Sequence, residues 1–118
     1  MPSSEKRQTL RIQPYVVPCR ILAGGRRFPG YLTDLSTKGA RVSCDLDPPP
    51  AGVPVVLEVR FGRQVRYSRL PAEIKWSRPP GEGETHTLGL TFEGVTAEEQ
   101  EKLESIVGEF QRRAAQLA

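Results

Sequence analysis

Short runs of alternating apolar and polar residues, separated by turns rich in glycine and proline, constrain the fold of this chain more than any other feature. Side chains alternate between the two faces of a β-strand, so each run predicts a strand with one buried face. Between Pro54 and Phe61, for example, Val55, Leu57 and Val59 share one face. Turns that recur about every 8 to 12 residues are typical of small antiparallel sandwiches and barrels. We expect strands over residues 15–22, 28–33, 40–44, 54–61 and 86–92, with a long strand or a bent pair over 64–77.

A single helix is expected after the last strand. Thr96 and Glu99 form a capping-box pattern, in which the hydroxyl and the carboxylate each accept a hydrogen bond from a backbone N–H group at the start of the helix. Apolar residues then recur at helical spacing, and we expect this stripe to dock on an open end of the barrel. The predicted fold is therefore mainly β: a small six-stranded antiparallel β-barrel with a C-terminal α-helix. The expected parts of this single domain are a flexible basic N-terminal arm (residues 1–12), the barrel (13–95) and the helix (96–118). The stripe consists of Leu103, Ile106, Val107, Phe110, Ala114 and Leu117.

The size and composition of the chain limit what it can do. Its 118 residues suit one domain, and no apolar run approaches the roughly 20 residues of a membrane span. The N-terminus is polar and lacks a hydrophobic signal core, so we expect a cytoplasmic protein. Cys19 and Cys44 fall within strand patterns and are expected to be buried thiols. His86 is the only histidine, which excludes a catalytic triad with histidine and a multi-histidine metal site. We therefore expect neither catalysis nor a bound metal.

Positive charge is concentrated near the N-terminus. The formal net charge is +3 at pH 7. Residues 1–30 carry six basic side chains against Glu5, a local excess of +5, whereas the last 23 residues carry five glutamates against three basic groups. Such a field favours the approach of an anionic ligand to the arm and the first hairpin.

Two short polar motifs give this charge a specific meaning. The first, RQTLR, spans residues 7–11, and the second, DLSTKG, spans residues 34–39. Random shuffling of this composition would produce Asp-x-Ser-x-x-Gly only about once in sixty sequences, so the second motif carries most of the weight. In this order the two resemble the RxxxR and (D/N)xSxxG motifs of the PilZ domain family. Residues 39–42, 72–76 and 88–92 are similar to later strands of that family.

The resemblance implies a six-stranded barrel and a bacterial receptor for the second messenger cyclic di-GMP. It implies that Arg7 and Arg11 hold the ligand, since a guanidinium pairs with phosphate oxygens or with guanine O6 and N7. It assigns Asp34 and Ser36 to the Watson–Crick edge of a guanine, because a carboxylate accepts charge-assisted hydrogen bonds from the N–H groups of that edge. Gly39 is expected to adopt a positive φ and to let the ligand approach the backbone.

Three further residues are expected to matter less directly. Lys6 immediately precedes the first motif, at a position that in the family influences whether one ligand or a stacked pair is bound. Arg41 projects outward just after the second motif, within reach of a phosphate, although plain solvent exposure is its default role. Trp76 is expected to face inward with Ala72 and Ile74 as part of the core, with stacking on a base at the barrel rim as the alternative.

The leading functional hypothesis is a receptor in which cyclic di-GMP orders the arm against the barrel and so alters the activity of an unidentified protein partner. One alternative is a small barrel that binds single-stranded nucleic acid, which the pI near 9.1 favours. Such sites interleave exposed aromatic residues with basic ones, and most of the 8 aromatic residues here are expected to face inward. The other alternative is a ligand-free PilZ-like adaptor that acts through protein contacts alone. No membrane partner is expected, and the chain is expected to be a monomer or a homodimer.

Overall fold

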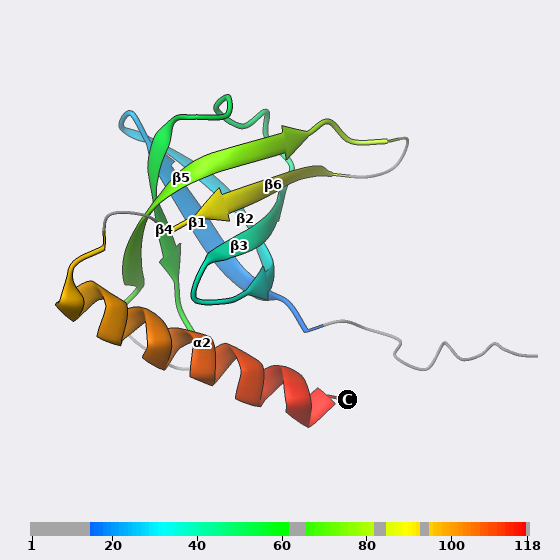
Figure 1. The fold of residues 1–118 in the computed structure, drawn as a ribbon. Coiled ribbons are helices and arrows are strands. Elements are labelled where there is room, and N and C mark those ends of the chain that lie inside the picture. The colour runs from blue at the N-terminus through cyan, green and yellow to red at the C-terminus, as the bar shows by residue number, and fades with distance from the viewer. Residues whose placement is uncertain (1–14, 62–65, 82–84, 93–94, 118) are drawn as a thin grey trace, which may run out of the picture.

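The computed structural model describes residues 15–61, 66–81, 85–92 and 95–117. Over these ranges the chain forms a closed six-stranded antiparallel β-barrel, and a long helix lies across one end of it (Figure 1). The barrel order is β1-β2-β3-β6-β5-β4, and β4 pairs with β1 to close the sheet. The predicted fold class is confirmed. The elements are β1 (Val17–Ala23), β2 (Arg26–Leu35), β3 (Gly39–Cys44), β4 (Pro54–Val59), β5 (Ser68–Arg78), β6 (His86–Thr91) and α2 (Ala97–Leu117).

Alternating side chains fill the inside of the barrel. Val42, Leu57, Leu70, Ile74 and Leu88 come from four different strands, and each is 0% exposed. Burying an aliphatic side chain of this size stabilises a fold by about 1.5–3 kcal/mol relative to leaving it in water. The short strands therefore owe their stability to the shared core.

Both cysteines belong to this core as free thiols. Burial, and to a smaller extent the neighbouring Cys44, raises the pKa of Cys19 to about 12. Burial also raises the pKa of Cys44, with smaller contributions from Asp45 and Asp47. A thiol that stays protonated at neutral pH is a poor nucleophile and a poor metal ligand. The two residues are structural, as the strand pattern predicted.

Four prolines lie within strands but outside one of the two ladders that each strand forms. Pro18 precedes the first β1–β4 pair on β1, and Pro54 precedes the first such pair on β4. Pro29 precedes the first β2–β3 pair, and Pro71 precedes the first β5–β6 pair. Proline has no N–H group to donate, so it is tolerated where a strand lacks a partner on one side. The closed barrel thus accommodates them without losing pairing between its strands.

The helix α2 closes one end of the barrel with its apolar stripe. The expected capping box is present, since Thr96 N–H donates to Glu99 Oε1 at 2.8 Å and Glu99 N–H donates to Thr96 Oγ1 at 3.1 Å. Leu103, Ile106 and Phe110 are buried in the common core, and the last of these contacts Tyr15, which precedes β1, with ring centroids 5.2 Å apart. Within the described ranges, no helix is long and apolar enough to cross a bilayer.

Two β-bulges change which way the side chains of the barrel point. The β2–β3 register shifts between Leu32 and Asp34, where Thr33 Oγ1 donates to the carbonyl oxygen of Arg41 at 3.2 Å. The β5–β6 register shifts between Ile74 and Trp76. A bulge adds one residue to one strand, so the side chains beyond it reverse their faces. The expectation that Trp76 faces inward is wrong for this reason, and its side chain lies on the outer face, 37% exposed.

Candidate ligand-binding site

Four positions form a transverse row across the outer face of β2, β3, β6 and β5. In the strand register, Asp34 pairs with Arg41, Arg41 with Gly89, and Gly89 with Trp76. Neighbouring strands lie about 4.8 Å apart, so the row spans about 14 Å. The two bulges place Asp34 and Trp76 at the ends of this row. All four residues line one open hollow of about 190 Å³.

The turn after β2 is shaped by the hydroxyl group of Ser36. Its Oγ accepts hydrogen bonds from the N–H groups of Lys38 and Gly39 at 3.2 and 3.3 Å, and the Ser36 N–H donates to the carbonyl oxygen of Gly39 at 2.9 Å. Asp34 Oδ1 accepts from the Leu35 N–H at 3.0 Å. These contacts are those of ordinary serine and aspartate turns. Both side chains are nevertheless exposed at the hollow, so a ligand can reach them.

The structure corrects the reason for a glycine at position 39. Among the described glycines, positive φ angles occur at Gly24, Gly25 and Gly52, and Gly39 does not share them. Instead, β3 approaches β6 so closely here that a Cβ atom on Gly39 would overlap the carbonyl oxygen of Leu90. Glycine is required at this position because the two backbones need the space, and this close approach holds the turn against β6.

The indole of Trp76 lies against the backbone of Gly89. A Cβ atom at position 89 would overlap Nε1 and Cε2 of the indole, so the absence of a side chain on β6 gives the ring its place. The guanidinium carbon of Arg78 is 5.4 Å from the centroid of the indole ring. A large aromatic ring is therefore held at a fixed place on the barrel surface, at the opposite end of the row from Asp34.

The charges around the hollow are mixed but mainly positive. Arg41 and Lys75 line it together with Asp34, and Lys38 is exposed in the adjoining turn. A carboxylate can accept the N–H donors of a purine edge, and guanidinium and ammonium groups can neutralise phosphate. An indole can stack on the face of a base. The hollow thus combines the three contacts that a nucleotide with a planar base requires.

Of the residues predicted from the motifs, Asp34, Ser36 and Gly39 lie together at the hollow, and so does Arg41, which was expected only as a secondary contact. Arg7, Arg11 and Lys6 lie outside the described residues.

Sequence reasoning missed the contribution of Lys75 and Gly89 to this site, and it gave stacking by Trp76 only as the alternative to a position in the core. A glycine inside an otherwise apolar strand indicates a close approach of other atoms to the backbone, so Gly89 carried a usable signal. The bulge that turns Trp76 outward depends on pairing with β6 and has no comparable local signal.

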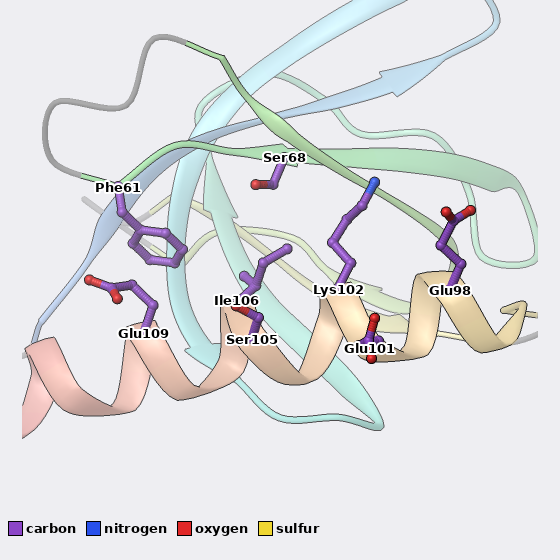
Figure 2. A pocket seen from close by; sticks show the side chains of 8 residues that line it. All are labelled: Phe61, Ser68, Glu98, Glu101, Lys102, Ser105, Ile106 and Glu109. Atoms are coloured by element: carbon purple, nitrogen blue, oxygen red, sulfur yellow. The ribbon is translucent and has the colours of Figure 1, made fainter.

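A second, larger hollow lies between α2 and the barrel, with a volume of about 650 Å³. Phe61 and Ser68 border it from the barrel side, and the other lining residues project from α2 (Figure 2). The α2 side carries Glu98, Glu101 and Glu109 against one lysine. An anionic ligand would be repelled there, so this hollow is not the candidate nucleotide site. Within the described ranges, no three His, Cys, Asp or Glu side chains are grouped so that they could hold a metal ion.

Both the sequence and the fold match known proteins. A family model described as the PilZ domain matches residues 5–109. Among solved structures, the PilZ domain with c-di-GMP of YcgR from Escherichia coli is similar with a TM-score of 0.66 at 20% sequence identity, and the match covers 86% of each chain. The Bacillus subtilis inhibitor of motility, MotI/DgrA, matches with a TM-score of 0.60 at 16% identity, covering 86% of this chain and 48% of that one. A comparison with curated proteins gives no match. At these identities, the structural matches establish a shared fold.

Proposed function

Because the chain belongs to the PilZ domain family, we propose that it is a receptor for cyclic di-GMP. The observation that carries the proposal is the row Asp34–Arg41–Gly89–Trp76, which places an acid, a cation and an aromatic ring in one hollow of the barrel. The same fold occurs in the YcgR domain whose structure contains c-di-GMP. In this chain, the row is the part of the ligand site that the barrel contributes.

Recognition of guanine is assigned to the Asp34 end of the row. The Asp34 carboxylate accepts N–H donors from the Watson–Crick edge, and the Ser36 hydroxyl completes that contact from the same turn. A charge-assisted hydrogen bond of this kind contributes about 1.5–3 kcal/mol. Gly39 keeps the turn close to β6, so that both side chains face the hollow.

The phosphates are assigned to cations from the barrel and the arm. Arg41 and Lys75 lie at the hollow, and Arg7 and Arg11 reach the ligand from the N-terminal arm, with Lys6 as a further contact. Two arginines four residues apart on an extended segment are about 13 Å apart at the backbone. One arm can therefore contact different parts of the same dinucleotide.

Ligand binding is proposed to signal through the arm to a protein partner. In the proposed division of the chain, the arm (residues 1–12) is followed by the barrel (13–95) and the helix (96–118). The arm is therefore attached to the barrel at its C-terminal end. Tyr15 lies just after the arm and contacts Phe110 of α2 at 5.2 Å. Closure of the arm over the ligand would act on this contact and change the surface next to it. No chemical step is involved, and the ligand leaves unchanged.

Replacing Trp76 with alanine is expected to weaken cyclic di-GMP binding by about 5- to 150-fold, because base–aromatic stacking is worth about 1–3 kcal/mol. Trp76→Phe retains a stacking surface and should lose less. The measurement is the Kd of each variant, with urea unfolding as the check on stability. Since the indole is on the outer face, both variants should fold. Equal affinities of the wild type and the alanine variant would exclude stacking on Trp76.

A thermal-shift screen with cyclic di-GMP, cyclic di-AMP and GTP tests the proposed function. A ligand present at about 100 times its Kd stabilises the folded state by about 2.7 kcal/mol, so a specific receptor should show a clear rise in Tm with cyclic di-GMP alone. No rise with any nucleotide would favour the ligand-free adaptor instead. Tyr31 and Trp76 are exposed aromatic residues, so the alternative of single-stranded nucleic-acid binding is tested as well. Binding to random oligonucleotides that weakens steeply with salt would favour that alternative.

A further inference from the structure

A groove on the outer face of β1 and β2 shares no residue with the row. It consists of two adjoining hollows, of about 260 and 360 Å³, which have Pro18 and Tyr67 in common. Tyr15 and Val16 line the first hollow, and Tyr31 lines the second. We call this surface the β1–β2 groove.

The floor of the β1–β2 groove is apolar and rigid. Tyr31 is 53% exposed and Val16 is 39% exposed, and Pro18 and Pro29 are exposed beside them. Exposed tyrosine together with arginine is typical of protein–protein contact surfaces. Because the prolines and the strands fix the backbone, a partner would bind here at a small cost in conformational entropy.

The Tyr67 end of the groove is basic. The guanidinium carbons of Arg20 and Arg60 lie 3.9 and 5.1 Å from the Tyr67 ring centroid. Glu58, only 6% exposed, is 2.7 Å from Arg20 and 2.9 Å from Arg69. One buried carboxylate therefore faces two arginines.

Arg60 supplies the positive charge that this carboxylate does not neutralise. It is exposed and has no acidic partner within the described part of the chain. Arg20, Arg60 and Arg69 against Glu58 and Asp45, which lines the second hollow with Arg20, leave a local net charge of +1. Such a field complements a negatively charged partner.

We propose that the β1–β2 groove binds an acidic segment of a protein partner that carries an aromatic or aliphatic anchor. The carboxylates of the segment would pair with Arg60 and Arg20, and the anchor would pack on Tyr31 and the prolines.

The test uses the ¹⁵N-labelled full chain and a short peptide of alternating Glu and Asp around a central Phe. The peptide should shift the amide resonances of Val16, Tyr31 and Tyr67. Replacing its acids with Gln and Asn should weaken binding by about tenfold or more, because the contact is electrostatic. Arg60→Glu and Tyr31→Ala should each weaken binding, and Lys102→Glu, an equal charge reversal on α2, should not.

Separate outcomes distinguish this inference from the proposed function. Arg60→Glu should lose the peptide and keep its affinity for cyclic di-GMP, because Arg60 lies outside the row. Peptide-induced shifts of amide resonances outside the β1–β2 groove in place of those within it would overturn the groove assignment. Equal binding of the acidic and neutral peptides would overturn it as well. A single-stranded oligothymidylate that bound the same residues more tightly than the peptide would also overturn it, by identifying a nucleic-acid surface.

Discussion

Replacing both Arg7 and Arg11 with alanine is expected to weaken cyclic di-GMP binding by at least about 100-fold. Each arginine is proposed to donate charge-assisted hydrogen bonds to the ligand, worth about 1.5–3 kcal/mol, so the pair would supply about 3–6 kcal/mol. The barrel residues of the row remain intact in this variant, and its fold should be unchanged. Isothermal titration of the purified full chain measures the loss.

A charge-matched control separates specific contacts from general attraction. Arg26→Ala combined with Arg27→Ala also removes two positive charges, but from the β1–β2 hairpin, outside the hollow. This control should lower the affinity only by the small factor expected from a weaker long-range field. Equal losses in the two double variants would show that the arm acts through charge alone. An unchanged affinity of the arm variant would remove the arm from the binding site.

Replacing Gly39 with alanine is expected to destabilise the fold by about 1–3 kcal/mol, the usual cost of forcing extra volume into a packed site. The added Cβ would overlap the Leu90 carbonyl oxygen, which belongs to a backbone that cannot rotate away. Displacement of the turn should also weaken cyclic di-GMP binding, because Asp34 and Ser36 would move with it. The midpoint of urea unfolding measures the first effect and a titration measures the second.

Gly108→Ala is the matched control for this prediction. Gly108 lies in α2, and a Cβ there would meet no atom within 4 Å. Alanine favours a helix over glycine by up to about 1 kcal/mol, so this variant should be more stable than the wild type. The same glycine-to-alanine substitution should therefore destabilise the fold at position 39 and stabilise it at position 108. A wild-type urea midpoint for the Gly39 variant would contradict the proposed backbone contact.

The features that the sequence predicted correctly depend on local pattern. The strands, the capping box at Thr96 and Glu99, and the burial of Cys19 and Cys44 all follow from the spacing of residues within a short segment. The order of the two motifs along the chain likewise identified the family. These properties need no knowledge of which strands pair.

The features that the sequence did not predict depend on pairing between strands distant in sequence. Trp76 faces outward because β5 contains an extra residue relative to β6. A strict alternation of inward and outward side chains along β5 does not reveal this shift. Gly39 was identified as a site residue, but for a positive φ that it does not have. Its actual constraint comes from β6, which lies about 50 residues later in the chain and meets β3 only in the closed barrel.

Titration of cyclic di-GMP into the full chain by isothermal calorimetry tests the central claim most directly. The proposed site predicts measurable heat at micromolar protein, a stoichiometry of one or two ligands per chain, and an affinity reduced by about tenfold or more in Asp34→Ala, which loses the charge-assisted contact with guanine. Asp47→Ala, which removes an exposed aspartate outside the row, should bind like the wild type. An absence of binding heat at micromolar protein, or equal affinities of the Asp34 and Asp47 variants, would contradict the claim that the row on the barrel binds this ligand.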